Sequence, residues 1–392
     1  MHKEVVIAGP VRTPIGALNG TLVEVAATSL GSIAIQAALE RSGVPADQVS
    51  EVIMGNVLSA GLGQAPARQA ARGAGLPDAV GASIVNKVCG SGLKAVMLAA
   101  QAIQCGDADV VVAGGMESMS RAPYLLDKAR NGYRYGHGQL LDSVLLDGLV
   151  DPYSNMPMGG CADRCAARYA FSRQQQDDFA VTSYQRALAA AAAGVLKREI
   201  VPVTAPAGKS TQLIFDDEGP KRFNEAKLRQ LKPAFSEQGT VTAGNASSLN
   251  DGAAAVVVLS AEKAAALGVR PVAKILGYAS ASREPEWFTL APISAMARLM
   301  KHLRLTVDGV DLFEINEAFA VVTMAAMLEL KIPHQKTNVL GGAVALGHPL
   351  GASGARTLVT LLTALEQRNA KIGIVSLCIG GGEAVALAIE RM

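Results

Sequence analysis

The segment VNKVCGSGLKAVMLAAQAI, residues 85–103, places a cysteine between an apolar run and Gly-Ser-Gly, and an alanine- and leucine-rich stretch follows at once. This pattern predicts a strand that ends in a tight turn, with a helix starting directly after it. Because the glycines carry no side chains, we expect the sulfur of Cys89 to be accessible at this turn. A cysteine at a helix N-terminus also lies near unpaired N–H groups, which favour the thiolate over the thiol.

The order of elements around this segment occurs twice in the chain, although few residues are identical. Strands that alternate with helices of ten or more residues predict βαβ units with buried strands, and therefore an α/β fold. In the first copy we expect strands at 4–8, 49–57, 108–120 and 253–260, and a helix that runs from N-caps at Thr28 and Ser29 to Gly43. In the second copy we expect a strand at 271–280, a helix at 292–303, a strand at 310–320, a glycine-rich segment with its helix at 338–362, and a strand pair at 371–392.

A segment of different composition, about residues 121–245, separates the two copies. It holds most of the tyrosines, several charge clusters and an expected helix at 174–194. Long excursions of this kind usually serve function or act as lids. We therefore predict an N-terminal half made of 1–120 with 246–270, an inserted α+β loop domain at 121–245 that covers the site, and a C-terminal half at 271–392.

Net charge, cysteine content and the N-terminal sequence indicate which partners and which cellular compartment to expect. Lys+Arg 36 against Asp+Glu 34 leaves a net charge of +2, which gives no reason to expect nucleic acid or an anionic membrane. Five cysteines in 392 residues argue against a disulfide framework and fit a reducing compartment. The N-terminus shows no signal-peptide pattern, and no apolar run approaches the ~20 residues of a membrane span. We therefore expect a soluble, cytoplasmic protein.

Cys161 and Cys165 lie four residues apart in one expected helix, a spacing that can hold a metal ion. No second Cys/His pair follows nearby to complete four ligands. We interpret both as packing residues and predict no metal site.

Two further glycine-framed segments carry reactive side chains. In ALGHPLGASGAR, residues 345–356, His348 lies in a loop between glycines just before an expected helix. In SLCIGGGEA, residues 376–384, Cys378 ends an apolar strand, and the N–H groups of the three following glycines can point at a developing oxyanion. Asn316 interrupts the strand-to-helix junction INEAFA, where it is either an N-cap or a polar group of the site.

Each of these residues also has a purely structural interpretation, as a packed thiol, a satisfied histidine or part of a tight turn. Together, however, a thiol, an imidazole and a second thiol, each at an element end beside glycines, form the set that acyl transfer through a thioester requires. Cys89 and His348 occupy corresponding places in the two copies. We therefore expect them to face each other across a pseudo-two-fold interface.

The chain resembles the thiolase family over essentially its whole length. The motifs VCGSGLKA, GGMESMSRAPYLL, TAGNASSLNDGAAA, NEAFA, GHPLGASGAR and CIGGG stand in the order and spacing of that family. The resemblance implies a duplicated thiolase fold in five layers, αβαβα, with the loop domain inserted in the N-terminal half. It also implies a homo-oligomer, with a tetramer favoured over a dimer.

The resemblance assigns a role to each reactive residue. Cys89 is the nucleophile that carries the acyl group, and His348 is the base that activates it. Asn316 holds a water in the oxyanion hole beside His348. Cys378 shuttles the proton at the α-carbon of the second acyl-CoA, and the N–H groups of Cys89 and Gly380 form the other oxyanion hole. This chemistry uses no metal or redox cofactor, and coenzyme A thioesters are its small-molecule substrates.

The resemblance places the coenzyme A contacts mainly in the inserted region. Lys221 and Arg222 would supply cationic contacts, although without the resemblance a solvated surface pair explains them equally well. The full set of predicted contacts is Met158, Lys221, Arg222, Phe235, Ala243, Ser247, Ala318 and Phe319.

The chain is most similar to the branch of the family that forms acetoacetyl-CoA, but it departs from that branch in four places. Pro157 stands where the branch often has His, Leu340 where it has Asn, and Glu383 where it has Gln. Trp287 and Phe288 stand where it usually has Met-Gly near the acyl pocket. Because none of these is a reactive side chain, the departures bear on acyl-chain length and CoA affinity. The bulk of Trp287 and Phe288 favours a short acyl group.

The sequence therefore predicts an acyltransferase that condenses two acetyl-CoA into acetoacetyl-CoA and CoA, reversibly and by a ping-pong mechanism. The nearest alternative is a 3-ketoacyl-CoA thiolase for longer or substituted chains. Ketoacyl-synthase chemistry is a weaker alternative, because Cys378 stands where that chemistry ordinarily uses a second histidine. A third alternative is an inactive, CoA-binding scaffold.

Overall fold

A mixed β-sheet runs through the protein, which is described by a computed structural model over residues 3–392. Ten strands of the described residues form this sheet in the order β14-β15-β16-β13-β1-β12-β5-β3-β4, with β2 beside β12. The strands are β1 Val5–Arg12, β2 Gly16–Ala17, β3 Glu51–Gly55, β4 Gly81–Val85, β5 Val110–Ser118, β12 Asn250–Ser260, β13 Ala273–Ser282, β14 Leu312–Ile315, β15 Ile372–Ile379 and β16 Glu383–Arg391.

The sheet has two halves that meet at the pairing of β1 with β13. This antiparallel pairing comprises Val6 opposite Lys274 and Ile7 opposite Ala273. The N-terminal half contains β1, β12, β5, β3 and β4, and the C-terminal half contains β13 to β16. Every residue of β5 and of β12 is buried, as expected for apolar strands that are covered on both faces. The duplicated arrangement expected from the sequence is therefore present.

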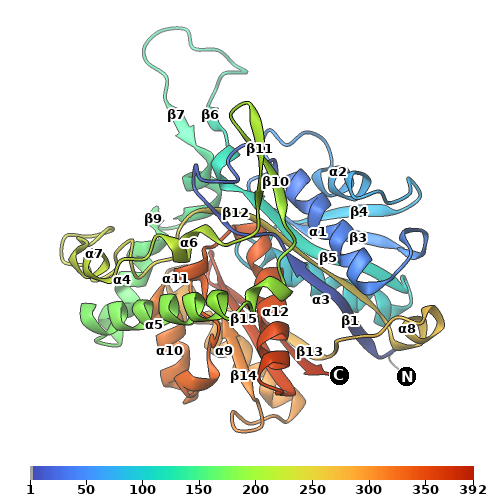
Figure 1. The fold of residues 1–392 in the computed structure, drawn as a ribbon. Coiled ribbons are helices and arrows are strands. Elements are labelled where there is room, and N and C mark those ends of the chain that lie inside the picture. The colour runs from blue at the N-terminus through green and yellow to red at the C-terminus, as the bar shows by residue number, and fades with distance from the viewer. Residues whose placement is uncertain (1–2) are drawn as a thin grey trace.

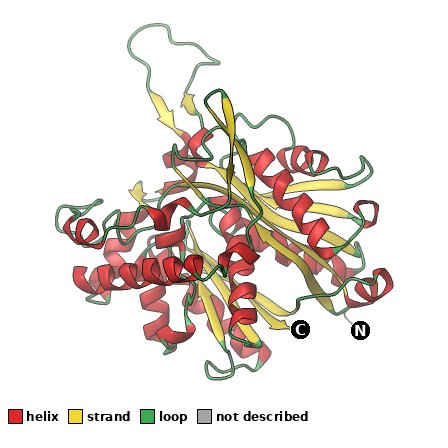
Figure 2. Cartoon of the chain, in the orientation of Figure 1, coloured by secondary structure: helices red, strands yellow, loops and turns green. Residues whose placement is uncertain are grey.

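Helices cover the sheet in three layers. The middle layer is α3 Ser91–Cys105 and α12 Leu350–Gln367, which pack against each other and contact strands of both halves. α1 Ala27–Ser42, α2 Pro66–Gly73 and α8 Ala261–Leu267 cover the outer face of the N-terminal half. α9 Ala291–Leu303 covers the C-terminal half, with α10 Ala320–Leu330 packed beside it. Together with the two sheet halves these layers form the αβαβα fold (Figure 2).

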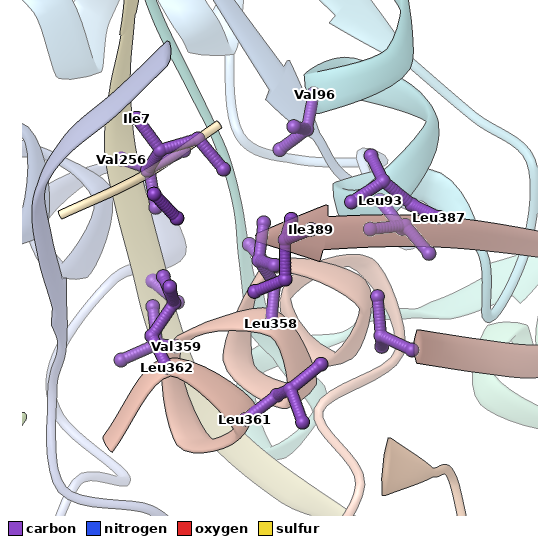
Figure 3. Close-up of a cluster of buried hydrophobic side chains, with 14 of the residues drawn as sticks. Ile7, Leu93, Val96, Val256, Leu358, Val359, Leu361, Leu362, Leu387 and Ile389 are labelled. Carbon is purple, nitrogen blue, oxygen red and sulfur yellow. The ribbon is translucent and has the colours of Figure 1, made fainter. Parts of the chain in front are cut away.

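The largest core lies between the two sheet halves. Leu93 and Val96 of α3 and Leu358 of α12 meet Ile7 of β1 and Leu387 of β16 there (Figure 3). All five side chains are completely buried. Burial of apolar surface of this kind stabilises by about 25 cal/mol per Å². This core holds the two middle helices in a fixed relative position.

The segment Val88–Cys105 is, by length and composition, apolar enough to cross a membrane, but 61% of it is buried inside the protein. Its apolar character is accounted for by its place between the sheet halves.

The segment between β5 and β12 contains both helices and short strands, as expected of an inserted α+β region. Its β6–β7 hairpin projects from the rest of the chain, at the top of Figure 1. The elements of this segment are β6 Tyr124–Leu126, β7 Leu140–Asp142, β8 Val150–Asp151, β9 Met156–Pro157, α4 Met158–Arg168, α5 Arg173–Ala192, β10 Val203–Ala207, β11 Ser210–Ile214, α6 Glu218–Lys221 and α7 Glu225–Gln230. The exact domain boundaries proposed from the sequence stay a prediction.

Two local predictions are wrong. Helix α1 starts at Ala27, and its N-cap is Ala26 without a side-chain hydrogen bond, so Thr28 and Ser29 are not caps. Ala27 is buried in the apolar core that α1 covers, so the helix begins one residue before Thr28 and Ser29. The strand expected at 310–320 is only β14, because the chain leaves the sheet at Asn316.

Candidate active site

A cavity of about 340 Å³ lies where the two sheet halves and the inserted region meet. Cys89 from the first copy and His348 from the second both line it. The other lining residues are largely apolar and come from several separate segments: Met119, Leu145, Gly148, Leu149, Pro157, Met158, Gly159, Ala234, Phe235, Ala243, Ala246, Ser247, Ser248, Leu249, Phe288, Ala318, Phe319 and Leu350. An apolar cavity with a few converging polar groups is typical of a ligand site.

Cys89 lies in the loop between β4 and α3, as the sequence predicts. The preceding residue, Val88, has φ of 43°, which is the left-handed region and a strained conformation for a β-branched side chain. Ser91 holds the loop in place, because its hydroxyl donates to the Val88 carbonyl (2.6 Å) and accepts from the Lys87 N–H (2.8 Å). Cys89 is only 8% exposed, so its sulfur opens to the cavity and not to the surface.

A hydrogen bond from its backbone N–H holds His348 in place. Its N–H donates to Oδ1 of Asn250 (2.9 Å), whose Nδ2 donates in turn to the Gly16 carbonyl (2.8 Å). Gly347 has φ of 106°, and a Cβ atom added there would lie 2.4 Å from Cγ of Asn250. Only glycine fits at this position, because a side chain would strain the backbone and displace the residue that holds His348.

The two ring nitrogens of His348 face different partners. Nδ1 lies 2.5 Å from Oγ of Ser353, one turn into α12. Nε2 lies 3.5 Å from Nδ2 of Asn316. Asn316 is not an N-cap, since α10 starts at Ala320 with Phe319 as its cap residue. Its backbone N–H donates to the Ser376 carbonyl (2.9 Å), which places it beside β15.

Cys378 and Gly380 approach Cys89 from β15 and from the turn that follows it. The backbone N–H groups of Gly380 and of Cys89 itself hydrogen-bond the Cys89 sulfur, and the charge of one thiolate would act on the other. A Cβ atom added at Gly90 would lie 2.4 Å from Cδ1 of Ile379, which shows how closely the two loops pack. The five predicted catalytic residues therefore meet at one place, with Cys378 and Asn316 buried behind the cavity wall.

Six of the eight predicted CoA contacts line the cavity, namely Met158, Phe235, Ala243, Ser247, Ala318 and Phe319. The Ser247 N–H donates to the Ala318 carbonyl (3.0 Å), so the segment that leads into β12 is tied to the INEAFA segment. Lys221 and Arg222 do not line the cavity. They are exposed and pair with Asp216 and Glu218.

Comparison with known proteins agrees with this geometry. The family model described as "Thiolase, N-terminal domain" matches residues 5–262, and the model described as "Thiolase, C-terminal domain" matches residues 269–391. The chain belongs to the thiolase family. "Acetyl-CoA acetyltransferase 2" of Arabidopsis thaliana is 54% identical over 393 residues, covering 100% of this thiolase and 98% of the plant protein. "Acetyl-CoA acetyltransferase" of Cupriavidus necator is 51% identical over 390 residues, covering 99% of each chain.

Solved structures of the family superimpose on this thiolase over its whole length. The Acat5 thiolase from Ascaris suum, in complex with coenzyme A, is 43% identical with a TM-score of 0.95 and full coverage of both chains. The acetyl-CoA acetyltransferase of Bacillus anthracis is 41% identical with a TM-score of 0.97, covering 100% of this chain and 99% of that one. The thiolase fold expected from the motifs is confirmed.

The thiolate expected at Cys89 is wrong for this thiolase. Burial raises the pKa of Cys89 to about 11, and the N–H groups of Gly380 and Cys89 offset only part of that rise. Burial likewise raises the pKa of Cys378 well above its ordinary value. Burial, with the nearby charge of Arg356, lowers the pKa of His348 to about 3. At neutral pH the site therefore holds neutral thiols and a neutral imidazole.

This protonation state predicts how alkylation of Cys89 depends on pH. Below its pKa of about 11 the thiolate fraction of Cys89 rises about tenfold per pH unit. The rate of Cys89 alkylation by iodoacetamide should therefore rise by about the same factor per pH unit from about pH 7 to pH 10. Mass spectrometry of the Cys89 peptide in a Cys378→Ala background measures the rate, and the exposed Cys105 is an internal reference. A rate that reaches a plateau below about pH 8 would instead indicate a thiolate–imidazolium pair.

Sequence reasoning missed several residues that build the site. Glu117 is completely buried and accepts hydrogen bonds from the N–H groups of Val57 (3.0 Å), Leu58 (3.2 Å) and Gly351 (2.9 Å), so it ties β5 to the start of α12. Asn250 holds His348 as described. Both are polar residues at the end of an otherwise apolar strand, and this pattern is the signal that could have found them.

The four departures from the acetoacetyl-CoA-forming branch fall in different surroundings. Pro157 and Phe288 line the cavity, whereas Leu340 is packed in the central core. Trp287 lies beside the cavity wall with the guanidinium of Arg168 4.9 Å from its ring. Glu383 forms an ion pair with Lys87, two residues before Cys89, and so links the start of β16 to the loop before α3.

Cys161 and Cys165 are completely buried in an apolar cluster, which confirms that they are packing residues. Within residues 3–392, no group of three or more His, Cys, Asp or Glu side chains is placed to hold a metal ion.

Proposed function

We propose that this thiolase is an acetyl-CoA acetyltransferase, which condenses two acetyl-CoA into acetoacetyl-CoA and CoA and catalyses the thiolytic reverse. The observation that carries the proposal is the meeting of Cys89, His348 and the Gly380 N–H at one small apolar cavity. The names of the relatives that are about half identical over their full length support the same reaction.

The first half-reaction transfers an acetyl group to the enzyme. The sulfur of Cys89 attacks the thioester carbonyl as His348 accepts the thiol proton at Nε2, and the proton then passes to the departing CoA sulfur. The N–H groups of Cys89 and Gly380 donate to the carbonyl oxygen as it becomes negative. Donors of this kind typically contribute about 3 kcal/mol each to lowering the barrier.

The second half-reaction forms the carbon–carbon bond. Cys378 gives its own proton to His348 and, as a thiolate, removes a proton from the α-carbon of the second acetyl-CoA. The resulting enolate attacks the acetyl-Cys89 carbonyl. The Cys89 sulfur takes the proton held by His348 as it leaves, so two acetyl-CoA give acetoacetyl-CoA and CoA with no net proton change. Both steps proceed without a metal or redox cofactor, since a thioester already stabilises the α-carbanion.

Phe288 is expected to set the acyl-chain length. Its ring lines the cavity, is 2% exposed and lies edge-on to Phe319 with centroids 6.4 Å apart. Phe288→Ala should therefore raise the kcat/KM for longer 3-ketoacyl-CoA substrates, relative to acetoacetyl-CoA, by about tenfold or more, since each accommodated methylene is worth about 1–3 kcal/mol.

Thiolysis of a series of 3-ketoacyl-CoA substrates measures this preference and also tests the proposed function. The matched control is Trp287→Ala, which removes a neighbouring ring that does not line the cavity and should leave the ratio unchanged. A wild-type preference for the longer substrates would show that the protein is instead a 3-ketoacyl-CoA thiolase.

We further propose that the protein is a cytoplasmic homo-oligomer, with a tetramer favoured over a dimer. Exposed apolar side chains on the β6–β7 hairpin support self-association, since Tyr124, Leu126 and Leu140 are 63%, 50% and 67% exposed. The thiols that the reaction needs are free, which suits a reducing compartment. A monomer in analytical ultracentrifugation at micromolar concentration would contradict the oligomer.

A further inference from the structure

A buried ion pair lies directly behind Asn316. Arg356 of α12 is 1% exposed and Glu314 of β14 is 2% exposed, and Nη1 of the arginine lies 3.4 Å from Oε1 of the glutamate. Neither residue lines the catalytic cavity. Buried ion pairs often add no stability over a well-packed apolar pair, so their presence calls for another purpose.

The second arm of the guanidinium contacts Asn316. Nη2 of Arg356 lies 3.3 Å from Oδ1 of Asn316. A guanidinium can only donate hydrogen bonds, so the amide oxygen of Asn316 must face Arg356. The amide NH2 group is thereby turned to the opposite side, toward Nε2 of His348 at 3.5 Å.

This orientation fixes the proton on the imidazole. Because the Asn316 NH2 group is a donor, Nε2 of the neutral ring must be the acceptor, and the ring proton must reside on Nδ1. Nδ1 then donates to Ser353 Oγ, and the Ser353 hydroxyl donates in turn to the Pro349 carbonyl (2.8 Å). Each group in this chain is satisfied in only one direction, which the Arg356 guanidinium fixes at one end and the Pro349 carbonyl at the other.

We infer that Arg356 is a positioning residue that acts through Asn316, keeping Nε2 of His348 unprotonated and facing the cavity. The inference rests on the proposed function, in which Nε2 accepts the Cys89 proton. An Nε2 without a proton is the form that general-base catalysis requires. One further observation agrees with it: after burial, the positive charge of Arg356 contributes to the low pKa of His348.

The test removes both buried charges together, in the variant Arg356→Met/Glu314→Gln, so that no unpaired charge is left behind. We expect kcat for condensation to fall about 10- to 100-fold with KM changed less than about twofold, as for loss of a group needed only in the transition state. The acidic limb of the rate profile for Cys89 acetylation should also move to higher pH, because the charge that lowers the His348 pKa is gone.

A double-mutant cycle separates positioning from a general structural effect. In an Asn316→Ala background the charge-free variant should cause no further loss of kcat, since Arg356 would no longer have an amide to orient. An additive loss overturns the inference. Arg356→Lys gives the same test if the charge-free variant does not fold. This variant keeps the positive charge and should cause a smaller loss of kcat than the charge-free variant. In the Asn316→Ala background, Arg356→Lys should cause no further loss of kcat.

Arg12 supplies the matched control. It is the other fully buried arginine, paired to Asp217 and Glu199, and it has no contact with Asn316. Arg12→Lys should lower the melting temperature but leave kcat within about twofold.

Intact-protein mass spectrometry separates the two proposals. If the wild-type chain acquires no acetyl adduct, the proposed function is wrong. If it acquires the adduct but the double-mutant cycle is additive, only the proposed role of Arg356 is wrong.

Discussion

Cys89→Ala is expected to abolish acetyl transfer, with kcat at least about 10⁴-fold lower and no mass gain after incubation with acetyl-CoA. The sulfur of Cys89 faces the cavity and is the acceptor for the N–H groups of Gly380 and Cys89. Without it, His348 has no nucleophile to deprotonate. The cavity itself should remain, because alanine fills nearly the same volume, so coenzyme A binding should change little.

The control for this variant is Cys105→Ala, which removes the exposed thiol at the end of α3 and should behave as the wild type. Intact-protein mass spectrometry after acetyl-CoA addition, with steady-state rates of acetoacetyl-CoA formation, measures both. An acetyl adduct that persists in Cys89→Ala would place the nucleophile elsewhere. No adduct on the wild-type chain would favour a CoA-binding scaffold.

Cys378→Ala is expected to separate the two half-reactions. The Cys378 sulfur lies behind Cys89 at the end of β15 and takes part only in proton transfer at the α-carbon. The variant should still acquire the acetyl group, but condensation should fall about 10³-fold, within the range typical of general acid–base groups. Exchange of the α-hydrogens of acetyl-CoA with deuterated solvent should be lost in parallel.

Cys165→Ala is the matched control, because Cys165 is a completely buried thiol of the same apolar cluster as Cys378. It should keep both half-reactions. If Cys378→Ala also loses the acetyl adduct while it remains folded by circular dichroism, Cys378 is needed already in the first half-reaction and its proposed role is wrong.

The sequence predicted the fold and most of the residues at the site because both depend on local patterns. Apolar runs that end in glycine give strand ends and turns, as at Cys89 and Cys378, and the repeated order of elements implied that Cys89 and His348 would meet. Six of the eight CoA contacts that the family resemblance implied line the cavity.

What the sequence could not predict depends on burial and on contacts between distant segments. A helix N-terminus lowers the pKa of a thiol, but the second copy and the inserted region close over Cys89, and the resulting burial raises its pKa to about 11. The chain from Arg356 through Asn316 to His348 joins β14, α12 and a loop, and no single stretch of sequence contains it. Likewise, the pairing of Glu383 with Lys87 joins residues 296 positions apart.

The division of the site between the two copies has a consequence for a nascent chain. Cys89 is synthesised with the first copy, whereas His348, Cys378 and Gly380 arrive only with the second. Until the second copy docks, the thiol has neither a proton acceptor nor a donor for the negative oxygen, even where acetyl-CoA is abundant. Chemical competence therefore depends on the docking of the second copy onto the first.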